Sequence, residues 1–157
     1  MTMPAPIYTS IPNHWGFHNP VRVTVGRGCR HALVPQLSGQ SLLIVTSQRG
    51  RRQLIMDGVL GSLMVQNRII WADNIPENPG LTDLQPEINR LASENFDAVI
   101  AFGGGSVIDA AKALNVSLGF EFLKYTQHEL LTQPELHSTA RPKPLYVLPT
   151  TSGTGSE

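Results

Sequence analysis

The chain has 157 residues, of which 41% are hydrophobic, enough to bury one core but with little room for a second domain. Twelve basic and twelve acidic residues give a formal net charge of zero, which argues against nucleic acid or an anionic membrane as a partner. No stretch approaches the roughly 20 apolar residues of a membrane span, and the N-terminus lacks the features of a secretory signal. Its single cysteine, Cys29, excludes an internal disulfide, so we expect a soluble protein of the reducing cytoplasm.

Residues 1–18 are interpreted as an N-terminal tail. His14 and His18 are four apart within it, but the surrounding prolines and glycine disfavour the helix that would bring the two imidazoles together. Beyond the tail, five runs have the length and the alternating or continuous apolar character of strands. They are Val21–Val25, Ser41–Thr46, Arg68–Ala72, Asp97–Phe102 and Leu145–Leu148.

One segment between these runs has clear helical periodicity, because its apolar residues are spaced to face one side. They are Leu84, Ile88, Leu91, Ala92 and Phe96. Thr82 and Gln85 have the spacing of a capping box at its start. Pro86 is then expected in the first turn, where a missing N–H costs little.

A second helix is predicted over Arg51–Leu63, although Gly58 and Gly61 each weaken it by about 1 kcal/mol relative to alanine. Its apolar positions are Leu54, Ile55, Val59 and Leu63. Farther along the chain, Thr132–Pro144 contains three prolines and is interpreted as a surface loop.

Strands that alternate with helices of this length indicate parallel pairing through crossover helices, and the apolar strands LLIV and AVIAF suit a sheet covered on both faces. The predicted fold class is therefore α/β, a doubly wound, mainly parallel Rossmann-like sheet with helices on both faces. Ligands of such sheets bind beyond the carboxyl ends of the strands. A site is thus expected in the loops after Thr46, Ala72, Phe102 and Leu148.

The stretch FGGGSVIDAAK, Phe102–Lys112, places three glycines between a predicted strand and a predicted helix. Gly103–Gly105 permit a turn with positive φ and let a ligand approach the backbone without a Cβ in the way. Ser106 then fits an N-cap, with Asp109 at capping-box spacing, and the N-terminus of such a helix favours a phosphate. A purely structural turn remains the alternative, because the third glycine of GxGxxG would fall at Ile108.

Two motifs resemble the signatures of one family. GGGSVIDAAKA is similar to the GGGSxxDxAKA signature of the group III, iron-containing alcohol dehydrogenases, and LPTTSGTGSE at Leu148–Glu157 is similar to their second signature. Glycerol dehydrogenases and dehydroquinate synthases share the first motif in looser form, whereas TTSGTGSE points to the alcohol dehydrogenase branch. NPVRVTVGRG resembles the family's opening strand and turn, and ENPG its PNP loop. The resemblance runs from about Asn19 onward and covers only the N-terminal part of the family's length.

This resemblance implies a dinucleotide-binding domain over residues 19–157, with NADP or NAD as its cofactor. The pyrophosphate would be held by Gly103, Gly104, Gly105, Ser106 and Val107. Asn78 would lie near the nicotinamide half, and the other side of the cleft would be lined by Thr150, Thr151, Gly153 and Thr154. The structural alternatives are a polar loop leading into a helix for TTSGTGSE, and a surface ion pair for Asp109 and Lys112.

One departure from the family pattern favours NADP over NAD. Many members that prefer NAD carry an acidic residue after the second strand, where it accepts hydrogen bonds from the adenosine ribose. Here Ser47 stands at that position, so no carboxylate would repel a 2′-phosphate, and Arg49, Arg51 and Arg52 follow. The alternative is that these arginines form a solvated start of a helix.

The resemblance also implies a divalent metal, Fe²⁺ or Zn²⁺, held by an aspartate and three histidines that follow the second motif in the family. None of the histidines here has the context of a family ligand; they are His14, His18, His31, His128 and His137. We therefore expect no catalytic residue and no metal ligand in this chain, with the helical metal-binding domain of the family absent from it. Cys29 is interpreted as packed or incidental rather than nucleophilic.

Together these observations predict the nucleotide-binding domain of a larger NAD(P)-dependent alcohol dehydrogenase or aldehyde reductase. The parent protein would transfer a hydride between nicotinamide and a small alcohol or aldehyde, while the isolated chain is expected to bind cofactor weakly and to be inactive. A missing domain would leave an apolar patch that favours self-association, and we expect a homo-oligomer. The alternative is a stand-alone nucleotide-binding or regulatory module; a lyase related to dehydroquinate synthase is disfavoured by TTSGTGSE.

Overall fold

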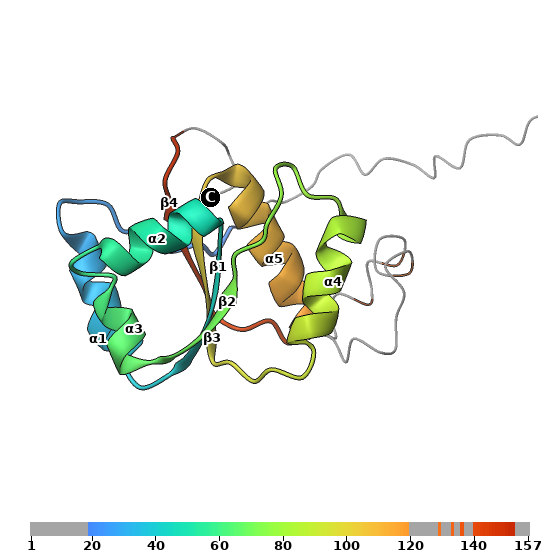
Figure 1. The fold of residues 1–157 in the computed structure, drawn as a ribbon, viewed down its shortest axis with the longest axis horizontal. Coiled ribbons are helices and arrows are strands. Elements are labelled where there is room, and N and C mark those ends of the chain that lie inside the picture. Colours follow the sequence, from blue (N-terminus) through green and yellow to red (C-terminus); the bar gives the residue numbers. More distant parts are fainter. Residues whose placement is uncertain (1–18, 120–128, 130–132, 134–135, 137–139, 153–157) are drawn as a thin grey trace, which may run out of the picture.

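The fold centres on a four-stranded sheet seen in a computed structural model that describes residues 19–119, 129, 133, 136 and 140–152 (Figure 1). Its strands are β1 (Ser41–Thr46), β2 (Arg68–Ala72), β3 (Ala98–Gly103) and β4 (Leu145–Pro149). They lie in the order β2-β1-β3-β4, and every neighbouring pair is parallel. The predicted α/β sheet is confirmed, and four of the five predicted strands form within one residue of their predicted bounds.

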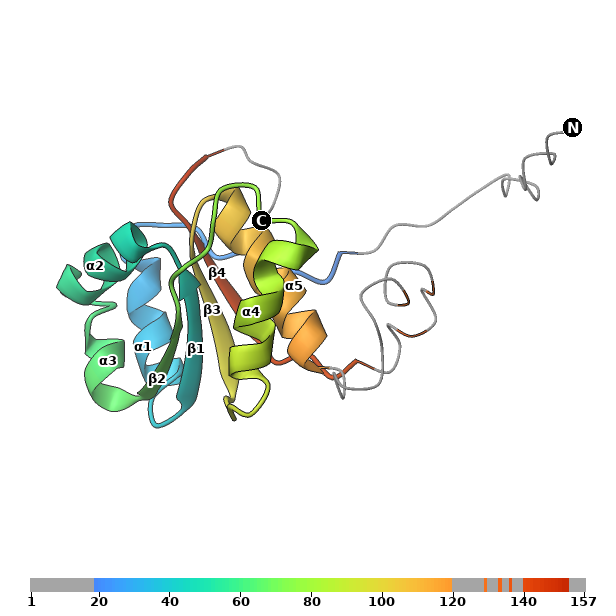
Figure 2. The ribbon, with the colours of Figure 1, turned by 45° about the vertical axis from the view of Figure 1, so that its right-hand side comes forward.

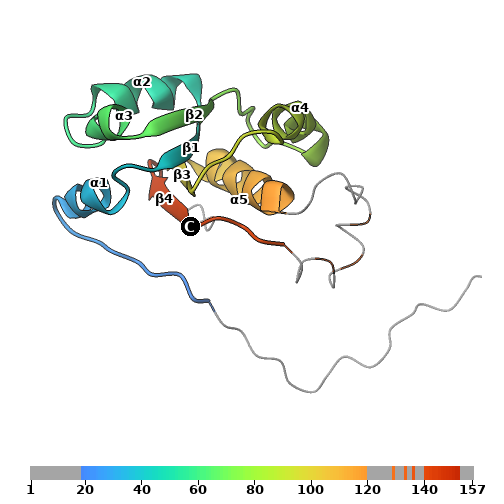
Figure 3. The ribbon, with the colours of Figure 1, turned by 90° about the horizontal axis from the view of Figure 1, so that it is seen from below.

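Helices cover both faces of the sheet, as predicted. One face carries a 3-10 helix, η1 (Cys29–Ala32), together with α1 (Leu33–Gln36), α2 (Gln48–Met56) and α3 (Ser62–Gln66). The other carries α4 (Leu81–Leu91) and α5 (Gly105–Gly119), which lie side by side in front of the sheet in Figure 2. Figure 3, a view from below, shows the sheet between these two layers.

The core is divided by the sheet into two clusters, and alternate residues of β1 serve one or the other. Leu43 and Val45 pack toward α4 and α5, while Leu42 and Ile44 pack toward the helices of the opposite face. All four side chains are fully buried, which stabilises the fold by roughly 1.5–3 kcal/mol each. This two-sided burial explains why β1 has a continuous apolar sequence rather than an alternating one.

The strand predicted at Val21–Val25 is wrong: this segment is irregular. Val21, Val23 and Val25 have 58%, 75% and 89% of their surface exposed. An alternating pattern makes a strand only where a neighbouring strand supplies backbone hydrogen bonds, and none of the four described strands pairs with this segment.

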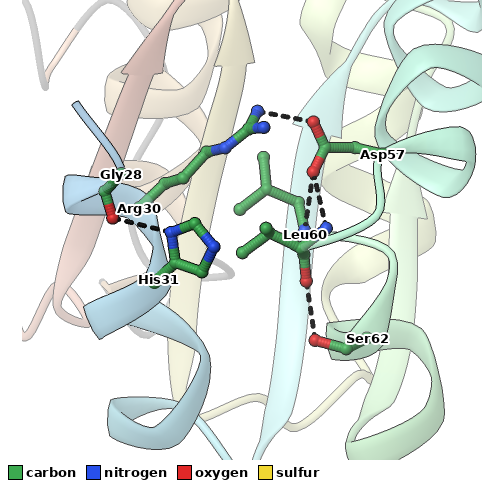
Figure 4. Close-up of polar contacts among 7 residues, drawn as sticks. Gly28, Arg30, His31, Asp57, Leu60 and Ser62 are labelled. Atoms are coloured by element: carbon green, nitrogen blue, oxygen red, sulfur yellow. Dashed lines mark hydrogen bonds and ion pairs between the residues drawn. The ribbon is translucent and has the colours of Figure 1, made fainter.

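The single helix predicted over Arg51–Leu63 is wrong. The helix ends at Met56, Asp57 has an extended backbone, and a second helix, α3, begins at Ser62. The Asp57 carboxylate accepts hydrogen bonds from the N–H groups of Val59 and Leu60, each at 2.9 Å. Figure 4 shows the same carboxylate paired with Arg30 of η1. The Leu60 N–H, then the Val59 N–H and the Arg30 guanidinium, lower the pKa of Asp57. An aspartate turn thus replaces the middle of the predicted helix.

The apolar face predicted for α4 is largely confirmed, but its start is not. Four of the five residues are buried, namely Leu84, Ile88, Leu91 and Phe96, whereas Ala92 is exposed. The capping box predicted for Thr82 and Gln85 is wrong, because the helix begins two residues earlier and the Gly80 N–H donates to Asp83 Oδ2 at 2.8 Å. Pro86 consequently lies in the second turn, where it removes an intrahelical hydrogen bond.

Candidate functional site

The turn from β3 into α5 forms the centre of the candidate site. β3 ends at Gly103 and α5 begins at Gly105, so a single residue, Gly104, separates strand from helix. The N–H groups of Val107 and Ile108 both donate to Gly104 O at 3.1 Å. The N–H groups of Gly105 and Ser106 precede these first intrahelical bonds, at the end of the helix where the dipole favours an anion. The turn therefore has the construction of a phosphate site.

The glycines are needed for space rather than for positive φ, so that part of the sequence interpretation is wrong. Among the described glycines, positive φ occurs at Gly26, Gly28 and Gly39. A Cβ on Gly103 would lie 2.7 Å from the Cβ of buried Val107, and a Cβ on Gly104 would lie 3.2 Å from Thr151 Oγ1. The first contact concerns packing of strand against helix, and the second concerns the approach of two loops.

Ser106 joins the loop after β2 to the glycine turn. Its hydroxyl oxygen accepts a hydrogen bond from the Asn78 N–H at 3.0 Å, and Asn78 itself has φ of 47°. Ser106 lies inside the first turn of α5, so the N-cap predicted for it is wrong. Its hydroxyl stabilises a neighbouring loop instead of its own helix. Asp109 and Lys112 form the exposed ion pair that the structural alternative predicted.

The second motif meets the glycine turn because β4 pairs with β3. The parallel register places Pro149 beside Gly103, and the Thr150 N–H donates to Gly103 O at 2.9 Å. Thr151 then stands against Gly104. Two sequences some 45 residues apart are thus joined at one edge of the sheet. Gly153 and Thr154, predicted to line the same side, lie outside the described residues.

We call this group of residues the strand-end cleft: Asn78, Gly103–Ser106, Thr150 and Thr151. In Figure 1 it lies at the top of the sheet, where the carboxyl ends of the strands meet. Val107, the remaining residue predicted for the pyrophosphate, faces inward: its side chain is buried in the core and its N–H bonds to Gly104 O. Val107 supports the turn from behind and presents no free N–H.

Ser47 begins α2 at the carboxyl end of β1. Its hydroxyl accepts from the Gly50 N–H at 3.1 Å, which makes it the N-cap of α2, and an isolated bridge links it to Asn74. Arg51 points toward β2, where it pairs with Asp73 at 2.8 Å and stacks on the Trp71 ring at 4.6 Å from the centroid. Sequence reasoning grouped Arg51 with Arg49 and Arg52 and missed both partners.

A cavity of about 460 Å³ lies beside the edge strand β2. Its charged lining is balanced by the ion pairs Arg51–Asp73, Arg68–Glu94 and Arg90–Glu87. The Glu87 carboxylate, through its hydrogen bond, raises the pKa of Arg90. Arg90 also donates to Trp71 O, so it covers part of the unpaired edge of β2. The two motifs and the N-terminus of α5 meet elsewhere, at the strand-end cleft.

The described residues contain no group of three or more histidine, cysteine, aspartate or glutamate side chains that could hold a metal ion. No described helix is both long and apolar enough to cross a membrane.

The family model of the iron-containing alcohol dehydrogenases matches residues 20–157. The chain belongs to the iron-containing alcohol dehydrogenase family. One relative is the probable alcohol dehydrogenase EutG of Salmonella typhimurium, which is 43% identical over 83 residues, 52% of this chain and 20% of that protein. The mitochondrial hydroxyacid-oxoacid transhydrogenase of Xenopus tropicalis is 33% identical over 126 residues, 77% of this chain and 27% of that protein.

Solved structures share the fold. An iron-containing alcohol dehydrogenase from Thermotoga maritima has a TM-score of 0.64 and 27% identity, covering 80% of this chain and 34% of that one. Sulfoacetaldehyde reductase from Bifidobacterium kashiwanohense, solved with NAD⁺, has a TM-score of 0.68 and 20% identity, covering 92% of this chain and 38% of that one. This chain spans between a fifth and a third of the length of the curated relatives described above.

Proposed function

We propose that this chain is the NAD(P)-binding part of a metal-dependent alcohol dehydrogenase or aldehyde reductase, and that the strand-end cleft holds the dinucleotide. One observation carries the proposal: three loops, from β2, β3 and β4, are fixed to one another around the N-terminus of α5. Membership of the family supports it, as does the NAD⁺ complex of sulfoacetaldehyde reductase. The whole-protein activity on a small alcohol or aldehyde is part of this proposal.

The residues of the cleft suit a dinucleotide. The Gly105 and Ser106 N–H groups would bind the pyrophosphate, and the absence of a Cβ on Gly104 lets Thr151 lie against the turn beside them. The Thr150 and Thr151 side chains would line the opposite wall, with Asn78 at the nicotinamide end. Nicotinamide, when bound, supplies or accepts a hydride. The divalent metal of the family does not fit the described residues, which offer no donor cluster, so we assign it no role in this part of the chain.

A cofactor titration tests the proposal. We expect NADPH or NADH to bind the chain saturably, as followed by nucleotide fluorescence. Gly104→Val should abolish binding, because its side chain would collide with Thr151 and displace it from the glycine turn. Gly58→Ala is the matched control, since a Cβ on Gly58 would meet nothing within 4 Å. A wild-type chain that binds neither nucleotide, or a Gly104→Val variant that binds like wild type, would contradict the proposal.

We also propose that NADP is preferred over NAD, with Arg49 and Arg52 facing the 2′-phosphate. These two residues are exposed and three apart on α2, so they lie on one side of the helix. Ser47, at the N-cap between them and β1, presents a hydroxyl where a carboxylate would repel the phosphate. Arg51 takes no part in this proposal, because Asp73 and Trp71 hold its guanidinium.

Replacing Ser47 with aspartate tests the preference for NADP. The added carboxylate retains the capping function but repels a 2′-phosphate and accepts from a ribose hydroxyl. We expect the ratio of the two dissociation constants to change toward NADH by roughly tenfold or more, a change of about 1.4 kcal/mol. Tighter binding of NADH than of NADPH by the wild-type chain would refute the preference while leaving the dinucleotide site intact.

The predicted homo-oligomer stays a proposal as well. Sedimentation velocity over a range of concentrations measures it, and a monomer at all concentrations would contradict it.

A further inference from the structure

The connection from α5 to β4 poses a problem of strand register. Positions 120–144, 25 residues, separate Gly119 at the end of α5 from Leu145 at the start of β4. β4 is an edge strand, and its residues Leu145–Leu148 are only half-buried. Burial therefore specifies its register weakly. A slip of two residues would carry Thr151 roughly 6–7 Å along the strand, away from Gly104.

Asn115 of α5 contacts the chain at the point where it returns to the sheet. Its side-chain Nδ2 donates to Lys143 O at 2.8 Å, and its Oδ1 accepts from the Lys143 N–H at 2.9 Å. The amide thus pairs with both backbone groups of one residue, as a neighbouring strand would. Asn115 is only 5% exposed and is one of three buried polar residues among those described.

The sequence of the returning segment makes this contact specific. Pro142 and Pro144 have no N–H, so Lys143 is the only backbone donor between Arg141 and Leu145. Pro144 O then accepts from the Val99 N–H at 2.9 Å and begins the pairing with β3. The two hydrogen bonds between Asn115 and Lys143 therefore lie one residue before Pro144, which accepts the first β3–β4 hydrogen bond.

Gly119 makes a second contact on the same face of α5, four residues from Asn115. Its carbonyl accepts from the Arg141 N–H at 2.8 Å. A Cβ on Gly119 would lie 2.8 Å from Pro142 N and 2.9 Å from Arg141 C, so only glycine lets the segment lie this close. The turn before α5 therefore contacts the second motif, through Gly104 and Thr151, and the C-terminal half of α5 contacts the segment that leads to this motif.

We propose that Asn115 is a positioning residue of the strand-end cleft: it fixes the register in which β4 pairs with β3, and so holds Thr150 and Thr151 against the glycine turn. This proposal rests on the proposed function only for its effect on cofactor affinity. Its effect on β4 can be measured without a ligand.

The test compares Asn115→Ala with Ser117→Ala, a matched control that removes another buried polar group from α5. Amide hydrogen exchange reads the register through the Thr150 N–H, which is bonded to Gly103 O. We expect exchange at Thr150 to become about tenfold faster in Asn115→Ala, with Ser117→Ala like wild type. The dissociation constant for NADPH, measured well below the unfolding temperature, should rise about fivefold or more, equivalent to about 1 kcal/mol.

The two readouts separate the possible failures. Unchanged exchange at Thr150 in a folded Asn115→Ala variant would overturn the proposal, and so would unchanged NADPH affinity in a chain that binds the nucleotide. If the wild type binds neither NADPH nor NADH, the proposed function fails, and exchange at Thr150 alone decides the register. If Asn115→Ala does not fold, Asn115→Ser replaces it: its single hydroxyl can make at most one of the two hydrogen bonds with Lys143, so both effects should be smaller but present. An Asn115→Ser chain that matches wild type in both would overturn the proposal.

Discussion

Gly50 offers the sharpest test of how α2 is attached to the sheet. A Cβ at this position would lie 2.2 Å from Thr46 Oγ1, far inside van der Waals contact. Thr46 is fully buried, and its hydroxyl donates to Phe102 O at 2.7 Å, which joins β1 to β3 just below the strand-end cleft. Gly50→Ala must therefore either turn the Thr46 side chain away from Phe102 or push the start of α2 off the sheet.

The magnitude follows from three contributions. Alanine improves an interior helix position by about 1 kcal/mol relative to glycine. Overpacking in a tight core costs about 1–3 kcal/mol, and breaking the buried hydrogen bond from Thr46 costs about 1–3 kcal/mol more. The net loss in the free energy of unfolding should therefore be about 1–5 kcal/mol, whereas helix propensity alone would predict a gain.

Urea unfolding followed by tryptophan fluorescence measures this loss, with Gly58→Ala as the control for a glycine that has free space. A double-mutant cycle with Thr46→Ala identifies the cause, because removing the hydroxyl makes room for the new methyl group. The two substitutions together should cost about 1–2 kcal/mol less than the sum of their separate effects. A Gly50→Ala variant as stable as Gly58→Ala, or strictly additive effects in the cycle, would refute this account of the contact.

Three further predictions concern packing, pH and capping. Gly103→Ala should lower the free energy of unfolding by about 1–3 kcal/mol in urea titrations, because its Cβ would meet the buried Val107 side chain at 2.7 Å; a neutral effect would contradict that contact. The pKa of Asp57 lies below its ordinary value of 3.8, so its ionised form stabilises the fold above that pH and the stabilisation is lost as the pH falls through the folded pKa. Wild type should thus be more stable than Asp57→Asn at pH 7 and lose that advantage in acid, and a constant difference would disprove it. Asp83→Ala should lower the free energy of unfolding by about 0.5–2 kcal/mol, because it removes the carboxylate that caps α4. Thr82→Ala should have almost no effect. A larger loss in Thr82→Ala than in Asp83→Ala would contradict this account and support the capping box predicted from sequence.

Sequence patterns predicted the strands of the sheet well because buried parallel strands have a distinctive apolar sequence. β1 and β3 are buried on both faces, and their continuous apolar runs, LLIV and AVIAF, are typical of buried parallel strands. The segment Val21–Val25 has a clear alternating pattern, but none of the described strands lies beside it. Whether a segment forms a strand depends on a neighbouring strand, which its own sequence does not reveal. The break at Asp57 was missed for a related reason: its carboxylate bonds to N–H groups two and three residues ahead, a local competition that apolar periodicity does not register.

The cleft was predictable in its motifs but not in its internal bonds. Strand, glycines and helix follow one another in the sequence, so this order, which the structure has, could be predicted directly. By contrast, the bonds from Asn78 to Ser106 and from Asn115 to Lys143 join residues 28 positions apart, and no spacing rule covers them. Of the two reasons assigned to the glycines, positive φ is wrong for Gly103 and Gly104, whereas the need for a position without a Cβ agrees with their contacts, although the close neighbours there are Val107 and Thr151 of the chain itself.

The contacts among the three loops of the strand-end cleft bear on its proposed binding of a dinucleotide. The contacts among its three loops, Ser106 with Asn78, Thr150 with Gly103 and Thr151 with Gly104, are made by the chain itself and need no ligand. The entropic cost of ordering the loops is therefore met during folding, and a dinucleotide bound as proposed would find the groups already in place. Because Asn115 and Gly119 contact the segment that leads to Thr150, part of that order originates in the C-terminal half of α5, 10 and 14 positions after Gly105. In the proposed site, the glycine turn and the whole of α5 thus act as one element.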